Sequence, residues 1–177
     1  MNPSRYHPVM VSLHWLLALL IAFSLGMGIL SLKDIPNSSP DKILALRVHL
    51  IAGILILALI LARFTARFLT PRPEPATTGN PFLDKIAVLT HYGLYLLIFL
   101  MAVSGVATSV QAGLPAIVFA GSGAPLPESF AIYWPRVAHG AMATLLLALA
   151  ALHILAALYH QFVRRDGLLS RMWFGRR

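Results

Sequence analysis

Four histidines lie within or beside strongly apolar stretches of the sequence: His14, His49, His139 and His153. A neutral imidazole carries one donor and one acceptor, and leaving either unpaired in an apolar medium costs roughly 2–7 kcal/mol. Such a side chain is used to bind a metal, to transfer a proton or to hydrogen-bond a neighbouring helix. His139 and His153 close the two ends of one run, HGAMATLLLALAALH. In a helix they lie about 21 Å apart along the axis and within about 40° of the same face, so one helix offers two imidazoles at two depths.

The composition is that of a membrane protein. Of the 177 residues, 58% are hydrophobic and only 11% are charged, which is too few polar side chains to cover a soluble domain of this size. Cysteine is absent, which excludes disulfides, iron–sulfur clusters and thiolate-bound zinc. The formal charge of +8 comes from Lys and Arg at the ends of the apolar runs, and this distribution does not indicate a nucleic-acid partner.

Four apolar stretches are long enough to cross the hydrocarbon core, which takes about 20 helical residues. Proline- and glycine-rich connections separate them, among them KDIPNSSPDK and TPRPEPATTGNP. Irregular backbone of this kind is not tolerated against lipid. We therefore predict an all-α fold, an integral membrane four-helix bundle, as a single domain over residues 1–177. Its predicted spans are residues 9–31, 44–62, 86–110 and 133–163.

The positive charges predict the orientation of the bundle. Ten Lys and Arg residues fall on the side that holds both termini, and four fall on the other side. Cytoplasmic segments carry the excess of positive charge, so both termini are predicted to be cytoplasmic. The ten are Arg5, Arg63, Arg67, Arg72, Lys85, Arg164, Arg165, Arg171, Arg176 and Arg177, and the four are Lys33, Lys42, Arg47 and Arg136.

This topology pairs the histidines by depth. His14 and His153 lie near the inner side of the membrane, and His49 and His139 lie near the outer side, each pair on two different helices. Helical bundles build cofactor sites from side chains on facing helices. The arrangement predicts two stacked haems, each with iron bound between two imidazoles, so that all four histidines are metal ligands.

Two other interpretations compete with haem ligation at these histidines. Hydrogen bonds to neighbouring helices would also satisfy the rings, and zinc or copper could bind them. A tetrahedral zinc site needs three or four protein ligands at one depth, yet no Asp or Glu lies inside any predicted span. Gly53, Gly105 and Gly140 are small residues that would leave room for a flat macrocycle.

Four stretches of the chain resemble the bacterial cytochrome b561 family, which includes membrane-bound superoxide oxidases. The resemblance implies an inner-membrane protein with two b-type haems, held by the pairs derived above, that passes electrons from superoxide to ubiquinone. The chain also resembles, more distantly, the di-haem membrane subunits of formate dehydrogenases and nickel–iron hydrogenases. The matching stretches are SLHWLLALLIAF (12–23), RVHLIAGILIL (47–57), LTHYGLYLLIFL (89–100) and AHGAMATLLLALAALHILAALYHQFVRRDGLLSRM (138–172).

Two further histidines mark the inner side as the candidate quinone site. His160 lies two helical turns beyond His153, and His91 enters the third span at a similar level. Either ring could hydrogen-bond a quinone carbonyl and supply a proton. The alternative is an interfacial histidine that bonds to water or to a haem propionate.

Two arginines lie beside the outer ligands and are the candidate catalytic residues. Arg136 precedes His139 by three residues, and Arg47 precedes His49 by two. Arginines in such places pair with haem propionates, and their charge also steers a small anion such as superoxide toward the haem edge. The superoxide assignment itself comes from the family resemblance.

We predict a di-haem cytochrome b that carries electrons from superoxide to ubiquinone. The alternatives are an electron conduit for another periplasmic donor or partner dehydrogenase, and a non-redox helical membrane protein. The basic C-terminal segment FVRRDGLLSRMWFGRR (162–177) is predicted to lie against anionic lipid.

Overall fold

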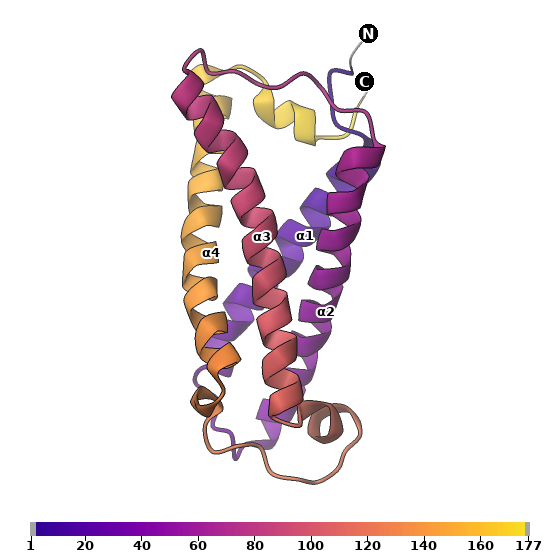
Figure 1. Ribbon diagram of the computed structural model, residues 1–177, viewed down its shortest axis with the longest axis vertical. Coiled ribbons are helices and arrows are strands. Elements are labelled where there is room, and N and C mark those ends of the chain that lie inside the picture. The colour runs from indigo at the N-terminus through magenta and orange to yellow at the C-terminus, as the bar shows by residue number, and fades with distance from the viewer. Residues whose placement is uncertain (1–2, 176–177) are drawn as a thin grey trace.

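The computed structural model describes residues 3–175 and consists of four long helices (Figure 1). No strand occurs within the described residues. Short helical turns extend or connect the long helices. The helices are α1 (Pro8–Met27), α2 (Pro40–Leu69), α3 (Pro81–Gln111) and α4 (Trp134–Tyr159), and the turns are η1 (Gly28–Leu32), η2 (Pro115–Phe119), η3 (Phe130–Ile132), η4 (His160–Arg164) and η5 (Leu168–Met172). The predicted all-α membrane bundle is confirmed.

Proline opens each of the long helices. A proline in the first turn has the φ angle of a helix, and its missing N–H would be unpaired there in any case. Side-chain caps accept a backbone N–H ahead of three of these prolines: His7 for α1, Ser39 for α2 and Asn80 for α3. The sequence indicated no role for His7, and its ring Nδ1 accepts from the N–H of Val9 at 3.3 Å.

These caps lengthen two of the predicted spans. α2 begins at Pro40, before the apolar stretch that starts at residue 44, and continues through Arg63 and Arg67 to Leu69. α3 begins at Pro81 rather than near residue 86. The difference arises because the predicted bounds followed hydropathy, whereas the caps and the hydrogen-bonded backbone continue into the polar boundary.

The long helices pack in chain order, α1 on α2, α2 on α3 and α3 on α4. The backbones of α1 and α4 approach each other closely in no more than isolated places within residues 3–175. Both described ends of the chain lie at one end of the bundle, with the connection between α2 and α3 (Figure 1). We name this the inner end, and the opposite one the outer end.

The surface of the bundle is apolar where lipid would contact it. Large side chains such as Leu30, Leu145 and Leu155 are 77%, 61% and 63% exposed. Each long helix is long and apolar enough to cross a membrane; the four candidate spans are Pro8–Leu32, Pro40–Leu69, Pro81–Gln111 and Trp134–Arg164. Exposed apolar surface on this scale is stable in a bilayer and not in water.

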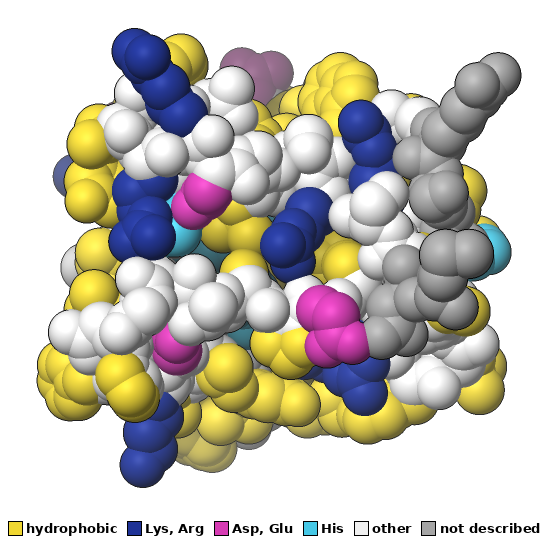
Figure 2. Space-filling view, turned by 90° about the horizontal axis from the view of Figure 1, so that it is seen from above, with side chains coloured by type: hydrophobic (Ala, Val, Ile, Leu, Met, Phe, Trp, Pro, Cys, Tyr) yellow, Lys and Arg dark blue, Asp and Glu magenta, His cyan; other side chains and the backbone are white. Residues whose placement is uncertain are grey.

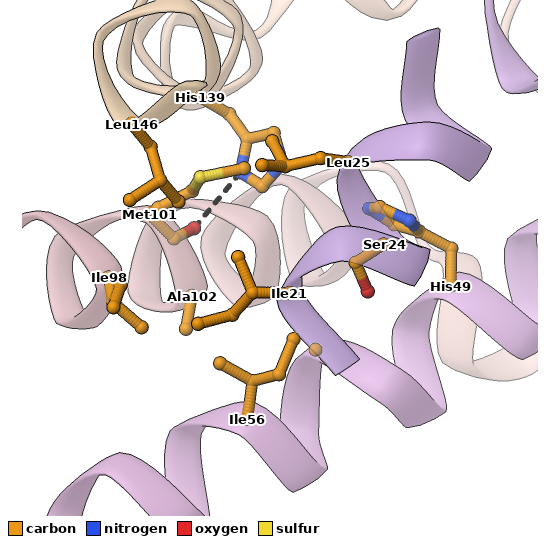
Figure 3. Close-up of a pocket in the computed structure, with 11 residues that line it drawn as sticks. Ile21, Ser24, Leu25, His49, Ile56, Ile98, Met101, Ala102, His139 and Leu146 are labelled. Carbon is orange, nitrogen blue, oxygen red and sulfur yellow. Dashed lines mark hydrogen bonds between the residues drawn. The ribbon is translucent and has the colours of Figure 1, made fainter. Parts of the chain in front are cut away.

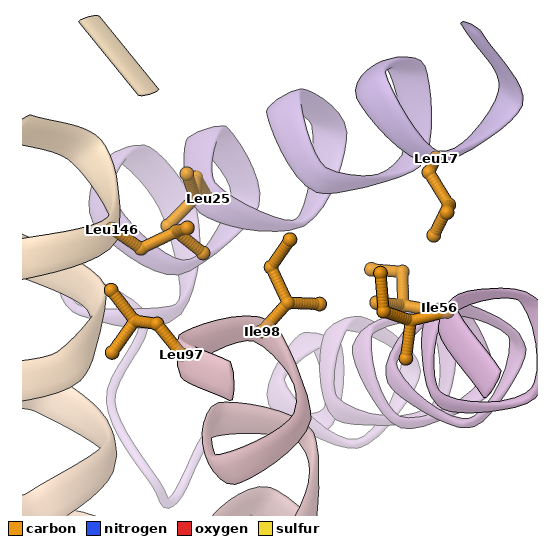
Figure 4. Packing of buried hydrophobic residues seen from close by; sticks show 7 residues of the cluster. Leu17, Leu25, Ile56, Leu97, Ile98 and Leu146 are labelled. Atoms are coloured by element: carbon orange, nitrogen blue, oxygen red, sulfur yellow. The ribbon is translucent and has the colours of Figure 1, made fainter. Parts of the chain in front are cut away.

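Two apolar clusters fill the interior. In the first, seven side chains from all four long helices pack together in the middle of the bundle (Figure 4). In the second, Leu46 of α2 packs against η2, where Val118 is fully buried. The first cluster consists of Leu17, Leu25, Ile56, Ile60, Leu97, Ile98 and Leu146.

The chain beyond α4 folds back across the inner end. Arg165 and Gly167 both have left-handed backbone conformations, with φ of 55° and 71°, and they reverse the chain after η4. η5 then crosses toward the N-terminal segment. Its flanks are held by hydrogen bonds from Trp15 Nε1 to the carbonyl of Met172 (2.9 Å), from Arg5 Nη1 to that of Phe174 (3.1 Å) and from Arg171 Nη1 to that of Glu74 (2.8 Å).

The described part of the basic C-terminal segment therefore lies against the protein, and its contact with lipid remains a prediction. Arg176 and Arg177, which contribute to the predicted orientation, lie outside the described residues. Figure 2 shows the inner end from above, with Lys and Arg side chains spread over the face and histidine atoms visible in a hollow between the segments that cross it.

Candidate functional site

The structure brings the histidines together in the two pairs that depth predicts. The ring centres of His14 on α1 and His153 on α4 are 6.3 Å apart, with the ring planes at 75°. Those of His49 on α2 and His139 on α4 are 6.2 Å apart, also at 75°. Each pair thus spans two helices, and α4 contributes to both.

These separations fit a metal ion between each pair of rings. A metal–imidazole bond is about 2 Å long, so two opposed bonds separate the nitrogens by about 4 Å and the ring centres by about 6 Å. No hydrogen bond joins the two rings of either pair in the described residues. Direct histidine–histidine bonding therefore does not account for the spacing.

His139 is oriented by the backbone of α3. Its Nδ1–H donates to the carbonyl of Met101 at 2.9 Å, and the hydroxyl of Ser104 lies 3.1 Å from the same nitrogen. A metal-binding histidine usually donates its second N–H in this way, which fixes the tautomer and leaves Nε2 for the metal. At Gly105 an added Cβ would lie 3.3 Å from His139 Cε1, so this glycine lets the ring lie against α3.

His49 lies across a cavity from His139 (Figure 3). Its Nδ1 is buried and has no hydrogen-bond partner within the described residues. An unpaired buried polar atom is unfavourable unless something outside the polypeptide satisfies the ring. The cavity is lined from all four long helices, by Ile21, Ser24, Leu25, His49, Gly53, Ile56, Ile98, Met101, Ala102, His139 and Leu146. This predominantly apolar lining suits a flat, hydrophobic macrocycle.

At the inner pair, a third ring contacts one of the two histidines. The ring centre of His91, on α3, is 5.2 Å from that of His153. His91 is exposed, and its Nδ1–H donates to the carbonyl of Ala87 at 2.7 Å, which leaves Nε2 free to meet another molecule. The structure therefore places His91 beside the inner pair, as its predicted level required.

His160 lies where α4 ends and pairs with an acidic residue of the turn that follows. Its Nδ1–H donates to Oδ2 of Asp166 at 2.6 Å, and Nε of Arg164 lies 3.5 Å from the same oxygen. The hydrogen bond from His160 lowers the pKa of the Asp166 carboxyl below its ordinary value of 3.8. The carboxylate therefore stays ionised near neutral pH and holds the imidazole in one orientation.

The outer cations differ in whether their side chains are hydrogen-bonded to backbone carbonyls. Arg47 donates from Nε and Nη2 to the carbonyl of Val118, at 2.9 and 2.6 Å, which secures η2 to α2. Lys42 is buried in the first turn of α2 and donates to the carbonyls of Leu32 and Ile35. Arg136 is exposed, and it lies within electrostatic range of both outer histidines. Of these three cations, Arg136 is the one whose charge faces the outer site without a backbone partner among the described contacts.

Sequence reasoning missed four contributors to the sites. Ser104 and the Met101 carbonyl orient His139, and Asp166 orients His160. Arg63 was used only to predict orientation, yet its Nη1 donates to the carbonyl of Met10, at 2.5 Å, beside the inner pair. Only its position at the end of an apolar run could have drawn attention to Arg63.

Within residues 3–175, no three His, Cys, Asp or Glu side chains converge on a point where they could hold a metal ion. One histidine from each of two helices faces a partner in each pair, and two imidazoles are the number that would complete an iron porphyrin with two axial ligands. A tetrahedral zinc or copper site would require more protein ligands than either pair supplies.

Comparisons with known proteins agree with this geometry. The sequence model of the prokaryotic cytochrome b561 family matches residues 5–175. Cytochrome b561 homolog 2 of Escherichia coli (strain K12) is 28% identical over 179 residues, covering 97% of this chain and 92% of that protein. Cytochrome b562 of Cereibacter sphaeroides is 29% identical, covering 94% of each chain. Probable superoxide oxidase CybB of Yersinia pestis is 25% identical, covering 95% of each.

The family match extends over nearly the whole chain and includes all four long helices and both histidine pairs. Membership accounts for the apolar surface, because proteins of this family lie in the membrane, and it implies a b-type haem. The chain belongs to the prokaryotic cytochrome b561 family and is a multi-pass electron-transfer protein of the inner membrane.

Proposed function

We propose that this chain carries electrons from superoxide at the outer face of the membrane to ubiquinone at the inner face, by way of two b-type haems each held between two histidines. The main support is the near-identical ring separation in the two pairs, 6.3 and 6.2 Å, at two depths of one bundle. In this proposal the inner end and both termini face the cytoplasm.

The four histidines determine what kind of chemistry takes place. A haem with two imidazole ligands has no open coordination position, so it supplies one-electron transfer and does not activate oxygen. The polypeptide orients the rings, through the Met101 carbonyl at His139, and excludes water with the apolar cluster of the bundle interior. Substrates therefore react at the two ends of the protein.

At the outer end, Arg136 is the residue that attracts superoxide. Its exposed cation raises the encounter rate of a small anion, an effect that weakens as salt increases. Arg47 contributes to the same positive field, although its guanidinium is held by the Val118 carbonyl. Two superoxide ions lose one electron each and leave as O₂. The balanced reaction is 2 O₂⁻ + ubiquinone + 2 H⁺ → 2 O₂ + ubiquinol.

At the inner end, His91 and His160 serve ubiquinone. His91 lies against His153 with one ring nitrogen free, so it is placed to hydrogen-bond a quinone carbonyl. His160 is held by Asp166 at the membrane boundary, where protons from the cytoplasm reach it. Both protons of ubiquinol are then taken up on the inner side.

A second candidate function uses the same haems with a different donor. Two of the outer cations, Arg47 and Lys42, donate to backbone carbonyls rather than presenting free charge, which makes the outer face less specific for an anion. In this alternative the chain conducts electrons to quinone from another periplasmic donor or a partner dehydrogenase. Membership of an electron-transfer family leaves no place for the non-redox interpretation.

Purified protein tests the proposal directly. We expect about two b-type haems per chain and faster reduction of a soluble ubiquinone analogue when superoxide is generated in the assay. The controls are assays without protein and a His139→Ala variant. Full haem content with quinone reduction no faster than in the protein-free assay contradicts the superoxide step and favours the second candidate. Fewer than two haems contradicts the paired ligation.

A further inference from the structure

Two partly buried arginines near the inner pair have no counter-ion within the described residues. Arg63 and Arg67 lie one turn apart on α2, both partly buried, and no carboxylate lies within 4.0 Å of either guanidinium in the described residues. The guanidinium of Arg63 reaches a buried position, since Met10, whose carbonyl accepts its Nη1–H, is 2% exposed. Nε of Arg67 is buried and has no hydrogen-bond partner among residues 3–175. Cations in such places are unfavourable unless an anion neutralises them.

A buried hydroxyl completes this group. The Tyr95 hydroxyl, on α3, is buried and has no hydrogen bond of good geometry, although it lies near enough to Arg63 to interact with it. Arg67 also stacks over Tyr92, with its Cζ 5.3 Å from the ring centre, which stabilises part of its charge. Donors from two helices thus remain available at one place. Together they match the acceptors of a carboxylate, which takes two or more hydrogen bonds.

The group lies at the inner histidine pair. In a regular helix the Met10 carbonyl accepts the backbone N–H of His14, so Arg63 contacts the same helical turn that carries this histidine. Arg63 is also within electrostatic range of His153. Arg63 therefore lies beside the two helices that carry the inner pair, and Arg67 lies one turn further along α2, over Tyr92 of α3.

No carboxylate of residues 3–175 lies within 4.0 Å of either guanidinium. Glu74 belongs to the connection between α2 and α3, where its backbone carbonyl accepts from Arg171. Asp84 accepts from Thr77 and Thr78, and Asp166 accepts from His160. Asp34, Asp41 and Glu128 belong to the opposite end of the bundle. Within the described residues these donors therefore have no carboxylate partner, and a b-type haem carries two carboxylates on its propionate side chains that would supply one.

We propose that Arg63, with Arg67 and Tyr95, binds the propionates of the inner haem. The inference rests on the proposed function, because it needs a haem between His14 and His153. It assigns the orientation of that haem, whose carboxylate edge would face α2 and α3 at the inner end. A planar guanidinium binds a carboxylate through two parallel hydrogen bonds, which lysine does not reproduce. The positive charge also favours the reduced haem, which has one more electron.

The test is the redox and vibrational behaviour of the inner haem in the purified holoprotein. We expect Arg63→Gln to lower the equilibrium constant for inner-haem reduction about tenfold, which is about 59 mV for one electron. The propionate-bending band in the resonance Raman spectrum should shift as well. Arg63→Lys should recover part of the potential and none of the band position, and the outer haem should be unaffected.

Two further variants keep the test decisive. Tyr95→Phe removes one oxygen without changing volume greatly, so it should fold and give a smaller shift of the same band even if Arg63→Gln does not assemble. Arg72→Gln, an exposed arginine of the connection between α2 and α3, removes the same charge and should leave band and potentials unchanged. Full haem content with an unmoved band in the Arg63 and Tyr95 variants overturns the inference. Loss of all haem binding in the wild-type chain contradicts the proposed function itself.

Discussion

The inner and outer histidine pairs have nearly the same geometry and very different surroundings. The rings are 6.3 and 6.2 Å apart at the same interplanar angle. At the outer pair, His139 is held by a carbonyl and a hydroxyl of α3. At the inner pair, a further histidine, His91, contacts His153, and cations of α2 lie nearby without carboxylate partners in the described chain.

This difference shows two uses of positive charge in one small bundle. At the outer end, Arg47 and Lys42 bind backbone carbonyls at helix ends, where unpaired C=O groups attract donors. At the inner end, Arg63 uses Nη1 to bind the Met10 carbonyl, and Nε of Arg67 has no hydrogen-bond partner in the described chain. Arg47 and Lys42 mainly stabilise the fold, whereas Arg63 and Arg67 also offer donors to the haem propionates that we propose. The two proposed haems would therefore differ in potential although each would have two imidazole ligands.

The largest expected effect tests whether the two pairs act independently. His49→Ala should remove the outer haem and keep the inner one, and His153→Ala should do the reverse, because each variant leaves a single imidazole in one site. Haem content should fall from about two per chain to about one, with different optical spectra for the two variants. Loss of both haems in each variant would show that the sites form only together.

A larger side chain at Gly53 should prevent haem binding at the outer site, although its Cβ would contact no protein atom. A Cβ added at Gly53 has nothing within 4 Å, yet Gly53 lines the cavity between His49 and His139. Gly53→Leu should therefore lower the content of the outer haem severalfold by filling its space. Gly26→Leu is the matched control, because Gly26 is also free of contacts but does not line the cavity. Equal haem content in both variants would argue against a macrocycle in this cavity.

Substitutions of Arg136 and Arg47 should have different effects on the rate of superoxide-dependent quinone reduction. Arg136→Gln should slow superoxide-dependent quinone reduction about two- to tenfold at low salt, with a smaller effect at high salt, because it removes free charge. Arg47→Gln should mainly reduce thermal stability, by about 1–3 kcal/mol, because it leaves the Val118 carbonyl without its donor. Equal losses of rate would mean that both arginines act on the substrate.

The smallest expected effect concerns the partner of His160. The pKa of Asp166 is lowered in the fold, so its bond to His160 persists above pH 3.8 and is lost only as the pH falls through the lower folded value. Asp166→Asn should slow quinone reduction about two- to fivefold near neutral pH and change its pH profile, because the imidazole loses its anionic partner. Haem content should not change. Asp34→Asn, an exposed carboxylate of the outer end, is the control.

Rigid geometry explains what could be predicted from the sequence. A helix rises 1.5 Å per residue, so apolar length and charge distribution are enough to assign each histidine a depth and a partner. His14 and His153 are 139 positions apart and still lie together, as expected. The family resemblance supplied the substrates, and superoxide and ubiquinone remain proposals.

The side-chain contacts around the sites could not be predicted, because the spacing of residues in the sequence does not determine them. Arg63 reaches a carbonyl 53 positions away, and Lys42 turns inward to cap the end of η1 instead of standing in a loop. His160 meets Asp166 only because the chain adopts a left-handed conformation at Arg165. Side-chain bonds to helix ends are set by where each helix stops, and that position follows caps rather than hydropathy.

One member of each histidine pair lies on α4, the last long helix to be synthesised. A nascent chain that has inserted only its first three helices carries just one member of each pair, His14 and His49. Neither can clamp a porphyrin from both sides until translation is almost finished. With the proposed ligands, cofactor loading would be an event of late biogenesis, and truncation ahead of residue 139 should yield a colourless membrane protein rather than a half-loaded one.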